Sequence, residues 1–138
     1  MIERIQCPTA PKALGNYSHA VVYQDLVIVS GMASRDPLSD RIPGLEVDAQ
    51  GRKIRYDIRA ETRGTLENIR RVLESAGSGL DHVLEVNTYL TNMADFGAYN
   101  EVYADFFPKL KPARTTVGVA SLPGQISIEI KVIAVKRK

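Results

Sequence analysis

The chain has 138 residues, of which 44% are hydrophobic and 25% are charged, and its formal net charge is +2. This length and balance are typical of one globular domain with a real core, and they argue against a disordered chain. The small net charge, without a stripe of basic residues and aromatic side chains, argues against a nucleic acid partner. No apolar stretch reaches the length of a membrane span, so no membrane partner is expected.

The chain contains one cysteine, Cys7, which excludes an internal disulfide and fits a reducing compartment. Residues 1–4 lack the pattern of a secretory signal, so a cytoplasmic location is predicted. There is no His/Cys cluster with metal-ligand spacing, no glycine-rich phosphate loop and no Gly-x-Ser-x-Gly elbow. We therefore expect neither a metal nor an organic cofactor.

The first half of the chain predicts a hairpin followed by a long loop. Residues 20–23 and 26–30 are short apolar runs on either side of a turn, which is typical of a β-hairpin. The second run does not alternate, so both faces of that strand are expected to be covered. Residues 33–56 are polar and rich in turn residues, and a loop of this length tends to be functional or mobile.

Two helices and three more strands are predicted after the loop. Asp57 is expected to cap a helix that ends at Gly77, and Asp95 a second helix that ends at Pro108. A strand is predicted over 83–90, with alternate residues on one face. The apolar stripes of these elements are Ile58, Thr62, Leu66, Ile69, Leu73 and Ala76; Leu84, Val86, Thr88 and Leu90; and Phe96, Tyr99, Val102, Tyr103 and Phe106.

Two final strands, from residue 115 and from residue 126, flank the turn residues 122–125. The order is therefore β-β-loop-α-β-α-β-β. The sequence predicts a single domain over 1–138 with an α+β fold, in which two helices pack on one face of a mixed sheet.

Arg114 and Glu129 lie in the run 112–117 and the segment 126–130, two strand-like segments that the short turn is expected to make neighbours. An arginine on a strand can bind a carboxylate through two parallel hydrogen bonds, and a nearby glutamate can orient or deprotonate water. The pair indicates a site where water attacks a small carboxylated molecule; the alternative is a cross-strand ion pair. A turn centred near residues 123–124 would put the two backbones roughly 13 Å apart, so a site built from two chains is expected.

Several separated motifs occur in order along nearly the whole chain. They lie at residues 15–20, 29–31, 66–69, 89–96, 99–103, 112–114, 122–123 and 128–130. Together they resemble the RidA/YjgF family of imine and enamine deaminases. The resemblance implies a chorismate-mutase-like α+β domain that assembles as a homotrimer, with active sites in clefts between subunits.

The resemblance also implies roles for individual residues. Arg114 matches the arginine that binds the substrate carboxylate, and Glu129 matches the glutamate that positions the attacking water. Gly31 lets backbone approach the ligand. Thr116 stands where many members have a cysteine, so it is counted among the substrate-binding positions but offers no thiolate. Other residues that line or support the cleft are Tyr17, Ser30 and Asn100.

Several alternatives remain open from the sequence. Residues 42–57 and 115–117 resemble the 2-aminomuconate deaminase branch, so the substrate is either 2-aminomuconate or a general 2-imino acid. His19 is expected to be structural, with a place in the cleft as the alternative, and Cys7 to be a half-buried thiol without chemistry. The other functions considered are a non-catalytic ligand-binding or chaperone-like trimer and an RNA-acting translation inhibitor. The basic residues of the long loop are expected to be solvated, unless one binds a second substrate carboxylate: Arg35, Arg41, Arg52, Lys53 and Arg55.

Overall fold

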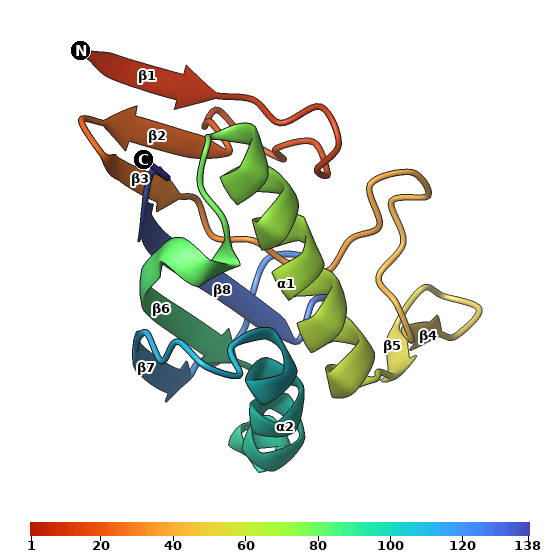
Figure 1. Cartoon of the computed structure of the whole chain (residues 1–138). Coiled ribbons are helices and arrows are strands. Elements are labelled where there is room, and N and C mark those ends of the chain that lie inside the picture. The colour runs from red at the N-terminus through yellow and green to blue at the C-terminus, as the bar shows by residue number, and fades with distance from the viewer.

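The computed structural model describes all 138 residues, as a six-stranded mixed sheet with two helices on one face (Figure 1). The strand order is β1-β2-β3-β8-β6-β7, and β6 and β7 are the parallel pair. This arrangement confirms the predicted α+β class. The strands are β1 (Ile2–Ile5), β2 (Ala20–Tyr23), β3 (Leu26–Val29), β4 (Glu46–Val47), β5 (Lys53–Arg55), β6 (Val83–Leu90), β7 (Ala113–Gly118) and β8 (Ile128–Val135); the helices are α1 (Ile58–Ser75) and α2 (Phe96–Phe106), with short 3-10 turns at Leu80–His82 and Met93–Asp95.

Helix α1 begins and ends where the sequence predicts. The side chain of Asp57 accepts a hydrogen bond from the backbone N–H of Ala60, at 3.1 Å. The helix ends at Ser75 with Ala76 as its C-cap, and Gly77 follows with a φ of 79°, a conformation that suits glycine. The predicted stripe of α1 is buried. The helix lies over the sheet, where it contacts β3 and β8 (Figure 1). Neither helix is both long enough and apolar enough to span a bilayer.

Two side chains of the predicted elements are placed differently from expectation. Leu84 is 48% exposed, because a register shift between Val83 and Glu85 turns it out of the alternating pattern. Asp95 does not cap α2 with its side chain; its carboxylate instead accepts a hydrogen bond from the hydroxyl of Tyr56, at 2.7 Å.

The predicted pairing of the last two strands is wrong, because β6 lies between β7 and β8. β7 pairs in parallel with one edge of β6, and β8 pairs antiparallel with the other. Helix α2 is the crossover that joins the parallel pair, and parallel strands need such a connection. The turn residues 122–125 therefore belong to a long connection around the end of β6 and not to a hairpin.

The helices cover one face of the sheet, and the other face is open in the chain (Figure 1). β3 is therefore not covered on both faces as predicted: Leu26 is exposed and Ile28 partly exposed. Tyr23 pairs with Leu26 on the same face and is exposed too. The open face thus carries apolar side chains that have no partner within one chain.

Candidate functional site

Glu129 lies on β8 with its side chain on the open face of the sheet. Its neighbours Ile128 and Ile130 point to the opposite face and are fully buried. Met32 and Ile130 exchange backbone hydrogen bonds of 2.8 and 2.9 Å, so the segment after β3 runs beside Glu129. A Cβ on Gly31 would lie 2.5 Å from Oε2 and 2.9 Å from Cδ of Glu129. The carboxylate therefore rests against the Gly31 backbone, where no larger residue fits without movement.

Glu129, Gly31 and Tyr17 line one cavity of about 300 Å³. Cavities of this size hold small molecules. Its walls come from the N-terminal segment, the segment after β3 and the connection before β8, which are far apart in the sequence. The other lining residues are Pro11, Lys12, Ala13, Leu14, His19, Met32, Ala33, Arg35, Ile42, Pro123, Gly124, Gln125 and Ile126.

Burial raises the pKa of the Glu129 carboxyl above its ordinary value. The carboxylate forms no ion pair within the chain, so no cation opposes this effect. A carboxylate with a raised pKa is a better proton acceptor than an ordinary one when it is ionised. Glu129 can therefore orient a water molecule in the cavity and accept a proton from it.

Arg114 lies on β7 and projects to the helix-covered face, because its register partner on β6 is the fully buried Val86. Its guanidinium carbon lies 4.5 Å from the ring centre of Tyr103, 5.5 Å from Tyr99 and 5.7 Å from Phe96. This contact holds the guanidinium through cation–π attraction and leaves the donors in its plane free. Arg114 forms no ion pair within the chain, so these donors can bind an anion.

Two buried hydroxyl groups without partners occur on the Arg114 side of the sheet. Thr116 lies on the same face of β7 as Arg114, and its Oγ1 is buried with no hydrogen bond. The hydroxyl of Tyr103 is also buried and unpartnered, and burial raises the pKa of Tyr103 to about 12. By contrast, the register partner of Thr116, Thr88, is bonded to the hydroxyl of Tyr99 at 2.6 Å. The Arg114 side thus offers a cation and neutral hydroxyls.

Arg114 and Glu129 do not meet within one chain. They project from opposite faces of the sheet and are separated by β6, on which Val86 and Tyr89 are their respective register partners. Two strand spacings and three residues along the strand separate the two backbones by roughly 14 Å. One chain therefore carries the cation on one face of the sheet and the carboxylate on the other.

The remaining predicted residues fall in three different surroundings. Tyr17 lines the Glu129 cavity, and its side chain is exposed. Ser30 does not line the cavity; its hydroxyl donates to the carbonyl of Ser18 at 2.6 Å and so ties β3 to the segment that carries Tyr17. Asn100 is exposed on α2, the helix whose rings contact Arg114.

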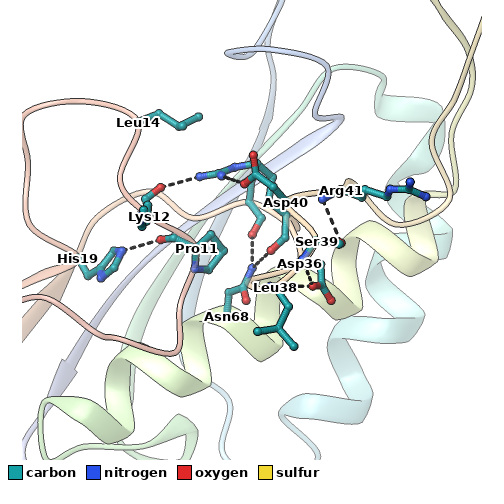
Figure 2. A network of polar contacts seen from close by, with 12 residues as sticks. Pro11, Lys12, Leu14, His19, Asp36, Leu38, Ser39, Asp40, Arg41 and Asn68 are labelled. Atoms are coloured by element: carbon teal, nitrogen blue, oxygen red, sulfur yellow. Dashed lines mark hydrogen bonds and ion pairs between the residues drawn. The ribbon is translucent and has the colours of Figure 1, made fainter.

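His19 is a structural residue at the edge of the cavity. Its Nδ1 accepts a hydrogen bond from the backbone N–H of Cys7 at 2.8 Å, and its Nε2 lies 2.7 Å from the carbonyl of Pro11 (Figure 2). A backbone carbonyl can only accept, so Nε2 carries the proton and the ring is neutral. Cys7 is more deeply buried than predicted, with its Sγ 3.4 Å from the hydroxyl of Thr9.

The long loop contains a hairpin that the sequence did not reveal, β4–β5, and this hairpin holds one wall of the cavity. Lys53 donates from Nζ to the carbonyl of Gln125, at 3.0 Å, and to the hydroxyl of Ser127. Gln125 donates back to the carbonyl of Gly51 at 2.7 Å. The buried Glu61 of α1 accepts from the N–H of Ser127 at 2.8 Å. Burial raises the pKa of its carboxyl, opposed in part by hydrogen bonds from Ser127 and by the charge of Lys53.

Sequence reasoning missed one cation of the cavity, Lys12, and did not single out a second, Arg35. Lys12 lies in a segment without regular structure and gave no signal. Arg35 was one of five basic loop residues among which the sequence offered no choice. Contacts between segments that are distant in the sequence bring both side chains to the cavity. The spacing of residues along the chain could therefore not reveal their position.

Comparisons with known proteins agree with this fold. The model of the family described as Endoribonuclease L-PSP matches residues 7–136. A RutC family protein of Pyrococcus horikoshii is 40% identical over 136 residues, which cover 99% of each chain. The chloroplastic Reactive Intermediate Deaminase A of Arabidopsis thaliana is 33% identical over 132 residues, 96% of this chain and 65% of that protein. The crystal structure of E. coli TdcF with bound serine has a TM-score of 0.84 and 29% identity, and covers 98% of this chain and 99% of that chain.

Proposed function

The chain belongs to the RidA/YjgF/L-PSP family, whose members are reactive-intermediate deaminases, and we propose that it hydrolyses small carboxylated imines and enamines without a cofactor. The observation that carries this proposal is the half-buried Glu129 carboxylate in a small-molecule cavity, resting on Gly31 with its pKa raised. The serine bound to the related TdcF, a small molecule with a carboxylate, supports the same class of ligand.

In the proposed reaction, Arg114 binds the substrate carboxylate and Glu129 accepts a proton from water as the water oxygen bonds to the imine carbon. The C=N double bond becomes single, and its nitrogen takes up a proton from solvent. The resulting carbinolamine loses ammonia as its C–O bond becomes a carbonyl: Glu129 returns its proton to the departing nitrogen, and the hydroxyl proton passes to solvent. An enamine first gains a proton at carbon to become the imine. One water is consumed and one ammonia is released, with no oxidation.

The proposed enzyme is a homotrimer in which Arg114 of one subunit meets Glu129 of another. The separation of the two side chains on opposite faces supports a shared site. The open, partly apolar face of the sheet, which includes Leu26 and Tyr23, supports an assembly that covers it. Mixed trimers of Arg114→Ala and Glu129→Gln subunits should regain activity that neither variant has alone, because some sites then contain both wild-type residues. No recovery in verified mixed trimers would refute a shared site.

The finer proposal for the substrate is 2-aminomuconate, with general 2-imino acids as the alternative. It rests on the resemblance of residues 42–57 and 115–117 to the 2-aminomuconate deaminase branch. Ammonia release should be compared for freshly generated 2-aminomuconate, 2-iminobutanoate and 2-iminopropanoate. A strong preference for 2-aminomuconate would support that branch, and similar rates would indicate a general deaminase.

The experiment that tests the function is the variant Glu129→Gln. The amide keeps the size of the side chain but cannot accept a proton, so ammonia release should fall by about 10²–10⁴. Affinity for an unreactive carboxylate should persist, as should thermal stability. A wild-type rate in the variant would mean that Glu129 is not the base. Absence of ammonia release by the wild-type protein, with ligand affinity retained, would favour a binding trimer.

The family description also names a ribonuclease, and RNA cleavage is therefore a second outcome to test. The net charge of +2 and the cavity of about 300 Å³ fit a small ligand better than a polynucleotide. RNA cleavage lost in Glu129→Gln would favour the ribonuclease.

We place the protein in the cytoplasm, as its single cysteine suggests, although the Arabidopsis relative is named as chloroplastic.

A further inference from the structure

Arg35 is the one basic residue of the segment 33–56 that lines the Glu129 cavity. Its side chain is only 17% exposed, although it lies on a loop. Arginine presents five N–H donors, and the contacts within the chain use two of them. One nitrogen donates to the carbonyl of Lys12 at 2.7 Å, and the other terminal nitrogen pairs with Asp40. Several donors therefore remain for a ligand.

The backbone that carries Arg35 is held firmly. The side chain of Asn68 on α1 donates to the carbonyls of both Ala33 and Arg35, each at 2.9 Å, and Asn68 in turn accepts from Arg71 at 2.7 Å. The next turn is closed by Asp36, whose carboxylate accepts from two backbone N–H groups at 2.9 Å. Figure 2 shows Asn68 beneath this loop, with Lys12 and Asp40 at the two ends of the contacts that orient the guanidinium.

The other basic residues of the segment are occupied elsewhere. Arg52 pairs with Asp48 and Arg55 pairs with Glu46, both on the exposed hairpin. Lys53 is bound to the connection before β8 and lies over an aromatic ring. Arg41 is exposed and points away from Lys12 and Asn68 in Figure 2.

We propose that Arg35 forms a subsite for a second anionic group, so that the preferred substrate is a small unsaturated acid with two carboxylates. This rests on the proposed function, in which Arg114 of a neighbouring subunit binds the first carboxylate at the same cavity. Lys12, which also lines the cavity, adds positive charge at this end. Asp40 does not line the cavity and its carboxylate is 73% exposed, so solvent screens its competition for Arg35.

The test compares two unreactive ligands of equal carbon skeleton, muconate with two carboxylates and sorbate with one, by titration calorimetry. The wild-type protein should bind muconate at least about tenfold more tightly, because a hydrogen bond to a charged group contributes an effect of this size. Arg35→Gln should abolish the preference and leave sorbate affinity within about twofold. Arg41→Gln, which removes a basic residue of the same loop outside the cavity, should keep the preference.

No preference in the wild-type protein, or a full preference retained in Arg35→Gln, would overturn the subsite. A fall in affinity for both ligands alike would show that Arg35 only supports the cavity. If Arg35→Gln does not fold, Arg35→Lys tests the same point. This variant keeps the charge and should keep part of the preference for muconate over sorbate. A complete loss of sorbate binding in Arg35→Lys would count against the inference. Because binding is measured without turnover, the result stands even if the protein releases no ammonia, an outcome that would refute the proposed function alone.

Discussion

Replacing Gly31 by alanine tests the role of Glu129 without changing Glu129 itself. The new Cβ would lie 2.5 Å from Oε2 and 2.9 Å from Cδ of Glu129, whereas ordinary contacts begin near 3.4 Å. The carboxylate must therefore retreat by about 1 Å. Gly31 has no positive φ, so alanine fits the backbone conformation, and the whole effect falls on the Glu129 side chain.

The expected effects on stability and on activity differ sharply. The clash involves the end of a flexible side chain, so its cost should lie near the lower end of the usual range of about 1–3 kcal/mol for overpacking. Loss of glycine freedom in the unfolded chain offsets about 0.4–1 kcal/mol of this. The free energy of unfolding should therefore change little. Misplacement of a catalytic group by about 1 Å, however, can lower the rate by about 10²-fold.

The assay pairs ammonia release from 2-iminobutanoate with thermal unfolding. Gly97→Ala on α2 is the matched control, since a Cβ there meets no atom within 4 Å and alanine favours a helix by about 0.5–1 kcal/mol. Gly31→Ala should lose about 100-fold in kcat/KM with a nearly unchanged melting temperature, and Gly97→Ala should keep its activity. Wild-type activity in folded Gly31→Ala would refute the argument that the position of Glu129 on this backbone matters.

Two further predictions concern the charged groups. Arg114→Lys should fold normally but lose at least about tenfold in kcat/KM, because lysine keeps the charge and lacks the planar two-donor grip on a carboxylate; near wild-type kinetics on carboxylated imines would show that Arg114 is not the anchor. The pH profile of kcat, which reports the complex in which the substrate carboxylate occupies Arg114, should fall on the acid side at a pH above the ordinary glutamate pKa of about 4.3, because burial raises the pKa of Glu129 and protonation removes the base. A profile that stays flat down to pH 4 would contradict this assignment.

Local patterns in the sequence were sufficient to predict most of the elements. The stripe of α1 from Ile58 to Ala76 is buried as predicted, and the hairpin of β2 and β3 forms around Gln24, whose φ is 55°. These features depend on residues close in the chain. Leu84 departs from its predicted face because of a register shift in β6. This shift depends on how β6 pairs with β8, and the sequence of β6 alone does not determine that pairing.

The order of the strands could not be predicted from turn residues. The segment 122–125 has the composition of a tight turn, yet it belongs to a connection between two strands that do not touch. What decides the pairing is the packing of α2, a crossover that delivers β7 to the free edge of β6. The contact of Gly31 with Glu129 is equally non-local, since the two residues meet only because Met32 pairs with Ile130.

The separation of Arg114 from Glu129 has a consequence for the chemistry we propose. Had they formed a cross-strand ion pair, the alternative that the sequence left open, they would attract each other, and an adjacent cation lowers the pKa of a carboxyl by about 1–3. Glu129 would then be a weaker base, and the donors of Arg114 would be used within the chain. On opposite faces, burial raises the pKa of Glu129 without a cation to oppose it, and Arg114 rests on neutral rings. In the trimer we propose, a substrate carboxylate occupies the arginine of one subunit, which leaves the glutamate of another free to act on water.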